Sequence, residues 1–372
     1  MLKYKAVVEE LCMLNIFRPI TVVLFIVIIS GCQSTQTTSR TNSNLFYEPE
    51  IFVDDAFGEY QSVSVESLEE VFELSHEMEQ QIVHKLLIER NHEKRAKKLI
   101  RILFLEKDSE IDYRYGANLT AKQAYLSKEA NCMSLTIMAY ALAEAAELDA
   151  VFQDVQVPEY WIRNGEHSLL TGHVNISIKL PREPNIALVW GSETLEIDFD
   201  PLVAKKSFPK KRITKNTILA MFYNNKGAQY LVDGDFDSAY AYFKSAIDSD
   251  PFFVSTWGNL GILYRLKGLY KHAEIAYKYA TDLDGDNLTA LTNYALLLKV
   301  KGNVVKAELI EKAIHEKRLS NPYYHALLAD EAHYAGNNRK AIIHYRKAIK
   351  LNKKIHEFYF GLAKVYFDMN EI

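Results

Sequence analysis

A period of 34 residues runs through the C-terminal part of this 372-residue chain and constrains its fold more than any other feature. Glycine recurs at one position of the period and alanine at another: Gly234, Gly268, Gly302 and Gly336, and Ala239, Ala273, Ala307 and Ala341. A repeat of this length is typical of stacked helical units, each of which buries its apolar face against its neighbours. The period therefore predicts an all-α solenoid over residues 213–372.

The second unit resembles a tetratricopeptide repeat. It reads Trp257-x-x-Leu260-Gly261-x-x-Tyr264, followed by Ala273, Tyr277 and Ala280, which follows the pattern of that family almost letter for letter. The resemblance implies four helix pairs and a terminal half-repeat, which begins at Tyr359 and stops after one helix. It also implies that the repeats bind a protein or peptide partner.

The N-terminus has the pattern of an export signal. Arg18 precedes an apolar run of about ten residues, which is too short to span a bilayer comfortably, and small residues follow. Ile29-Ser30-Gly31-Cys32 resembles the lipobox of bacterial lipoproteins. The resemblance implies a signal peptide over residues 1–31, starting at Met1 or Met13, and a lipid on Cys32.

The residue after Cys32 indicates which membrane the lipid enters. Gln33 stands where an aspartate would imply retention at the inner membrane, so the resemblance implies an anchor on the periplasmic face of the outer membrane. Residues 33–45 are polar and of low complexity, and we predict a flexible tether over residues 32–60.

Charge and motif composition exclude several classes of ligand. The net charge is −4, with acidic and basic residues mixed along the chain, so no field attracts nucleic acid. The sequence has no phosphate-binding glycine loop and no histidine pair with convincing metal-ligand spacing. We therefore predict no cofactor, no metal and no nucleic-acid partner.

Residues 61–212 change in pattern midway. Apolar residues three and four apart predict helices up to about Glu106 and again after Cys132, whereas β-branched and alternating runs with turn signals between them predict antiparallel strands from about Ala150. Helices followed by strands define an α+β domain.

Cys132 is the cysteine that remains free after export. Removal of the signal peptide takes away Cys12, and acylation consumes Cys32. A single thiol cannot form an internal disulfide, so Cys132 is either a buried small residue or a nucleophile. It stands at the start of a predicted helix, where the unpaired N–H groups and the helix dipole favour a thiolate.

Two later strands supply a base and an acid. His173 opens an alternating strand, and Asp198 and Asp200 share one face of the next one, where a carboxylate is able to accept the imidazole N–H and fix its tautomer. Strand geometry alone does not choose between the two aspartates, because both side chains point the same way.

A cysteine at a helix start, a histidine on a following strand and an aspartate on the next strand form an order that resembles the transglutaminase-like superfamily of papain-like folds. The likeness runs from about Asn118 to Pro201 and rests on "EANCMSL", "GHVNI" and "IDFDP". It implies a papain-like fold, with Cys132 as nucleophile, His173 as base, and Asp198 or Asp200 as the orienting acid.

Two functions follow from these patterns. The first is thiol-dependent acyl transfer or amide hydrolysis on a peptide or protein. The second is a non-catalytic adaptor, in which the α+β domain is degenerate and the repeats recruit a partner. Met133 and Asn175 stand where many active members carry tryptophan, which favours the adaptor, whereas the intact acid and base favour the enzyme.

Overall fold

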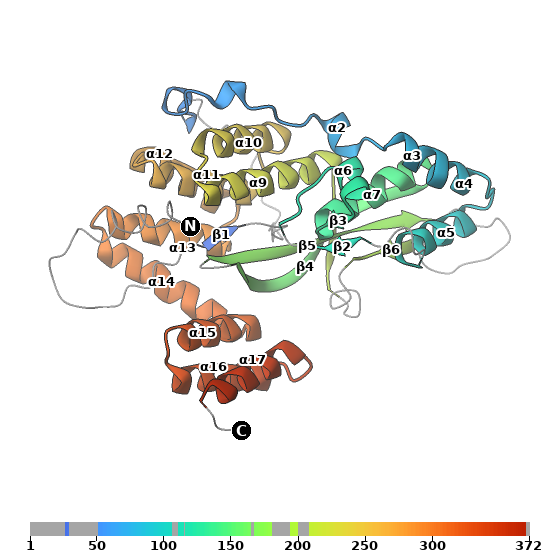
Figure 1. The fold of residues 1–372 in the computed structure, drawn as a ribbon. Coiled ribbons are helices and arrows are strands. Elements are labelled where there is room, and N and C mark those ends of the chain that lie inside the picture. Colours follow the sequence, from blue (N-terminus) through green and yellow to red (C-terminus); the bar gives the residue numbers. More distant parts are fainter. Residues whose placement is uncertain are drawn as a thin grey trace, which may run out of the picture.

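The computed structural model describes residues 27–29, 51–105, 111–114, 116–164, 167–180, 194–199 and 208–369. An α+β region is followed by a helical solenoid that carries the chain to its C-terminus (Figure 1). Cys32, Asp200 and nearly all of the predicted signal peptide lie outside the described residues. No described helix combines the length and the hydrophobicity needed to cross a bilayer.

The helices of the α+β region surround one central helix. They are α2 (Leu68–Phe72), α3 (His76–Met78), the π-helical turn η4 (Glu79–Val83), α4 (His84–Leu87), α5 (His92–Leu105), α6 (Ala121–Ser127) and α7 (Cys132–Ala145). Thr120 and Gln123 form a capping box at the start of α6. The mostly apolar α7 is buried over most of its length, as its composition predicts.

The strands form a mainly antiparallel sheet after these helices. Its members are β4 (Asp149–Asn164), β5 (His167–Lys179), β6 (Thr194–Ile197), β7 (Lys210–Ile213) and the short β1 (Val27–Ile29). The strand order is β1-β5-β4-β7, and β6 also pairs with β5. The pair of β1 and β5 is parallel, and the other described pairs of this sheet are antiparallel. Two further strands, β2 (Asp112–Tyr113) and β3 (Glu129–Ala130), pair with each other. The α+β class is therefore confirmed.

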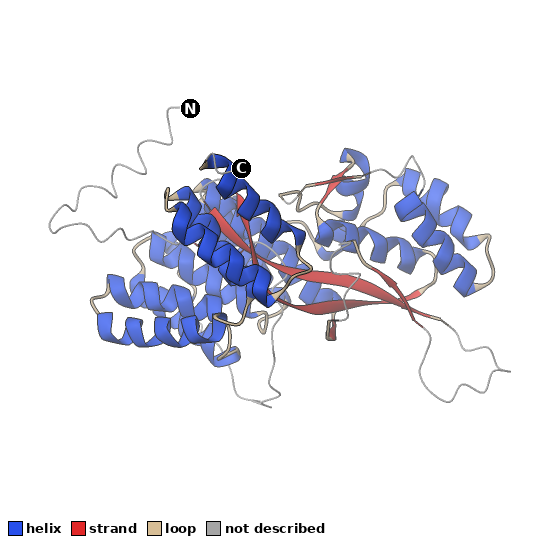
Figure 2. Cartoon of the chain, turned by 90° about the horizontal axis from the view of Figure 1, so that it is seen from below, coloured by secondary structure: helices blue, strands red, loops and turns tan. Residues whose placement is uncertain are grey.

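The solenoid consists of four helix pairs and one terminal helix (Figure 2). The helices are α9 (Lys215–Asp233), α10 (Phe236–Ser249), α11 (Val254–Leu266), α12 (Tyr270–Leu283), α13 (Leu288–Val300), α14 (Val304–Arg318), α15 (Pro322–Tyr334), α16 (Asn338–Leu351) and α17 (His356–Asp368).

The two periodic residue types explain this regularity. The four glycines lie after the first helix of each pair with φ between 74° and 81°, a left-handed conformation that costs glycine nothing. The four alanines are fully buried, and their small side chains let paired helices approach closely. Gly261 acts in the same way, since a Cβ there would lie 2.5 Å from the ring of Tyr277.

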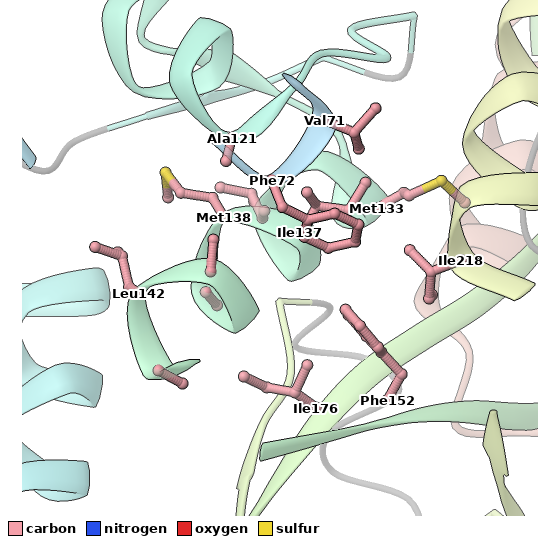
Figure 3. Packing of buried hydrophobic residues seen from close by; sticks show 14 of the residues in the cluster. Val71, Phe72, Ala121, Met133, Ile137, Met138, Leu142, Phe152, Ile176 and Ile218 are labelled. Atoms are coloured by element: carbon pink, nitrogen blue, oxygen red, sulfur yellow. The ribbon is translucent and has the colours of Figure 1, made fainter. Parts of the chain in front are cut away.

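The hydrophobic core of the α+β region continues into the solenoid. Ile218, Leu219 and Phe222 on α9 belong to the same buried cluster as α7 and β5. Figure 3 shows Ile218 next to Met133 and Phe152, within this cluster. The predicted division at residue 212 falls within β7. The first helix of the solenoid, α9, is therefore part of the hydrophobic core of the α+β region.

The predicted tether over residues 32–60 is wrong for its last ten residues. Residues 51–62, which we call the strap, lie across α10 and α11 and include two 3₁₀ turns, η2 (Asp54–Ala56) and η3 (Tyr60–Ser62). Phe57 is fully buried and stacks on Tyr240 at 4.1 Å between ring centroids. Apolar side chains at 51 and 57 explain the docking, since the polar composition of residues 33–45 does not extend to them.

Candidate functional site

Asn131 and Ser134 position the first turn of α7, which carries Cys132. The side chain of Asn131 caps the helix by accepting a 2.9 Å hydrogen bond from the Ser134 backbone N–H, and it donates a 2.6 Å bond to Asn118 Oδ1. Ser134 Oγ donates to the Ala117 carbonyl at 2.9 Å. Cys132 itself stays partly exposed. The helix start is therefore fixed to the preceding loop while its thiol remains reachable.

His173 lies on β5 with a side chain that is only 1% exposed. Its Nε2 is 2.8 Å from Asp198 Oδ1, and Asp198 immediately follows β6. Asn175 Nδ2 donates to the other carboxylate oxygen, Oδ2, at 2.8 Å. The carboxylate is thus held at both oxygens, which fixes the direction in which it meets the imidazole.

The surroundings of His173 keep its ring protonated. Burial lowers its pKa, but hydrogen bonds with Asp198 and Cys132 outweigh burial and raise the pKa from 6.5 to about 10. Because Nε2 faces Asp198, Nδ1 is the nitrogen left for the thiol. An imidazolium next to a cysteine is the arrangement that generates a thiolate nucleophile in cysteine enzymes.

The structure brings three of the four candidate catalytic residues together. Cys132, His173 and Asp198 form one chain of hydrogen bonds. Asp198 is the carboxylate that meets His173, whereas Asp200 lies outside the described residues. The sequence left these two aspartates unresolved.

Met133 and Asn175, which stand where many transglutaminase-like proteins carry tryptophan, both have polar contacts in this structure. Met133 is 1% exposed, and its Sδ lies 3.6 Å from Asn225 Nδ2 on α9. Asn175 holds the carboxylate of Asp198. Sequence reasoning missed this contact, although the alternation of β5 already placed Asn175 on the same face as His173.

Comparisons with known proteins identify the solenoid. The tetratricopeptide repeat family model matches residues 254–287 and 322–355. The helices of residues 254–368 therefore form a tetratricopeptide repeat solenoid, as the sequence predicts. Among the described residues, no group of three or more histidine, cysteine, aspartate or glutamate side chains is placed to hold a metal ion.

Solved structures resemble part of the chain only distantly. One from the functional characterization of Pseudomonas aeruginosa pilF is 18% identical with a TM-score of 0.28, over 42% of this chain and 72% of that one. A crystal structure of MamA protein is 22% identical with a TM-score of 0.25, over 41% and 84%. MamA 41-end from Desulfovibrio magneticus RS-1 is 17% identical with a TM-score of 0.26, over 41% and 86%. No curated protein matches the sequence.

Proposed function

We propose that this protein carries out thiol-dependent acyl chemistry on an amide of a peptide or protein. The observation that supports the proposal is the hydrogen-bonded chain from Cys132 through His173 to Asp198, with the thiol partly exposed and the imidazole buried. The order of helix, histidine strand and acid strand is that of a transglutaminase-like domain, and this is the fold that we propose for the α+β region.

The reaction has two halves. The Cys132 thiolate attacks the amide carbonyl, and backbone N–H groups at the start of α7 stabilise the oxyanion. The imidazolium of His173 then donates its proton to the departing amine, which leaves a thioester on Cys132. Water or a second amine attacks the thioester, His173 takes up the proton of the attacking group, and the Cys132 thiolate leaves, which restores the starting pair of thiolate and imidazolium. The products are a carboxylic acid or a new amide.

The two asparagines next to the site support these steps. Asn175 holds Asp198 in place, and Asp198 in turn stabilises the charged ring of His173. Asn131 keeps the first turn of α7 intact, so that the N–H groups near Cys132 stay aligned. The tetratricopeptide repeats fit a protein substrate or a protein partner that delivers one.

The direct test is the reactivity of the Cys132 thiol. In the folded wild-type protein at pH 7, iodoacetamide and an acyl electrophile should label Cys132 at least about 10-fold faster than they label glutathione. Denaturation in urea should remove the difference, and Cys132→Ala should abolish labelling of the mature chain. Equal rates for the folded protein and glutathione would rule out the enzyme.

We further propose a lipid anchor on Cys32, which places the protein on the periplasmic face of the outer membrane. The lipobox and the polar residues 33–45 support this location. Labelled palmitate should enter the wild-type protein and should not enter Cys32→Ser. A wild-type protein without label, released from cells with the soluble periplasmic fraction, would contradict the anchor.

An adaptor without chemistry is the second candidate. The tetratricopeptide repeats favour it, because such solenoids bind protein partners. In that case Cys132→Ala would leave partner recruitment and the cellular phenotype unchanged.

A further inference from the structure

One ion pair joins the solenoid to the sheet that carries His173. Arg318, the last residue of α14, donates from Nε to Glu159 Oε2 at 2.9 Å and from Nη2 to Oε1 at 3.1 Å. Asn321 Nδ2, at the start of α15, donates to the backbone carbonyl of Glu159 at 2.7 Å. The Arg318 side chain is 9% exposed and that of Glu159 is 20% exposed. In Figure 1, β4 accordingly reaches α15.

Glu159 lies in a bulge of β4 directly next to His173. Val155 pairs with His173, and Tyr160 pairs with Thr171. Residues 156–159 therefore stand opposite Gly172 alone, so the bulge separates the His173 pairing from the rest of the hairpin.

The bulge is held at both of its ends. The backbone N–H of Gln156 donates to the Pro209 carbonyl at 2.8 Å, just before β7. Glu159, at the other end, accepts hydrogen bonds from Arg318 and Asn321 of the solenoid. Bulges redirect strands and the side chains next to them. We therefore expect the hydrogen bonds to Glu159 to influence the orientation of the His173 side chain.

Arg318 is suited to hold the Glu159 carboxylate in one orientation. A guanidinium meets a carboxylate through two parallel hydrogen bonds, which set distance and orientation together. Arg318 Nη1 also reaches Thr292 Oγ1 on α13 at 3.3 Å. One side chain thus links two solenoid helices, α13 and α14, to the β4 bulge.

We propose that Arg318 is a positioning residue for the thiol site, which rests on the function proposed above. By holding Glu159, it fixes the bulge that sets the direction of His173, and so the solenoid controls the reactivity of Cys132. A protein bound across α13 to α15 would change that reactivity without touching the thiol.

A charge exchange tests the link in the full-length protein. Arg318→Glu and Glu159→Arg should each lower the rate of Cys132 alkylation about 10- to 100-fold, as expected for a misplaced catalytic group. The double exchange should restore the rate to within about 3-fold of wild type. Lys317→Glu is the matched control, because this neighbouring lysine is half exposed and pairs with Asp286 rather than with the sheet; it should change the rate less than about 2-fold.

The titration of the His173 ring, followed by NMR, separates this link from the proposed function. Each single exchange should shift the His173 ring resonances and their titration, and the double exchange should restore them. Wild-type alkylation no faster than that of glutathione would refute the enzyme, while these shifts would still support the link. Unchanged alkylation and unchanged resonances in Arg318→Glu would overturn the link.

A milder variant covers the case in which charge reversal unfolds the protein. Arg318→Lys keeps the positive charge and loses the two-pronged contact. It should melt close to wild type and still lower the alkylation rate about 3- to 10-fold. A wild-type rate in this variant, together with wild-type His173 resonances, would also overturn the link.

Discussion

Asp198→Asn is expected to lower the rate of acyl transfer at Cys132 about 10²- to 10⁴-fold. Asparagine retains the shape of the side chain and Asn175 remains next to it, but the negative charge that stabilises the protonated ring of His173 is lost. His173→Ala should have an effect of the same size. The measurement is the rate of Cys132 acylation by an activated ester at pH 7, in wild type and in each variant.

The same substitution should change the dependence of stability on pH. The pKa of His173 is raised from 6.5 to about 10 although burial lowers it, so the folded state binds this proton more tightly than the unfolded chain. The resulting stabilisation is complete below pH 6.5 and is lost as the pH rises through about 10. In urea titrations, the free energy of unfolding of the wild type should exceed that of Asp198→Asn most at pH 6. This difference should shrink as the pH approaches 10.

Glu196→Gln provides the control for both measurements. Glu196 lies on β6, two residues before Asp198, and forms an exposed ion pair with Lys210. An exposed pair contributes roughly 0 to 1 kcal/mol, so this variant should acylate at the wild-type rate at every pH. A slow Glu196→Gln, or a fast Asp198→Asn whose His173 titrates normally, would remove Asp198 from the mechanism.

A chain that ends at residue 212 is expected not to fold. It lacks Ile218, Leu219, Met221 and Phe222, which α9 contributes to the core of the α+β region. Burial of such side chains is worth about 1.5 to 3 kcal/mol each, so their loss removes roughly 6 to 12 kcal/mol. That loss is comparable to the whole stability of a typical protein, about 5 to 15 kcal/mol. Urea titration followed by circular dichroism should show no cooperative transition.

A chain that ends at residue 287 is the matched comparison. It retains α9 and α10 with their core residues, and also α11, on which α10 packs. This chain should unfold cooperatively. If the chain ending at residue 212 unfolded with the same midpoint, the α+β region would be an independent domain and the shared core would be unimportant to its stability.

The sequence predicted the solenoid in detail because its constraints are local. Gly268 ends a helix in a left-handed conformation, and Ala273 lets two adjacent helices touch, so each residue reports on neighbours within one repeat. The α+β order and the approach of His173 to Cys132 were also accessible, since strand alternation and a helix start are short-range patterns.

Long-range contacts were not accessible in this way. Nothing near Glu159 in the sequence indicates that its partner is Arg318, 159 residues later. Likewise, the apolar side chains of Ile51 and Phe57 indicate that they are buried, but not that Tyr240 and Tyr264 cover them. The contact between Asp198 and His173 was seen only once the position of the ring was known, because the alternation of the strand gives both aspartates the same direction.

The strap also determines when the protein can complete its folding. The hydroxyl of Tyr264 donates to the carbonyl of Ile51 at 2.7 Å, across a separation of 213 residues. Contacts so distant along the chain form slowly, because a large loop must close before they yield any stabilisation. A chain that emerges N-terminus first exposes Ile51 and Phe57 until the second repeat has appeared. Ile51 and Phe57 are therefore buried long after they are synthesised, and aggregation competes with folding during that interval.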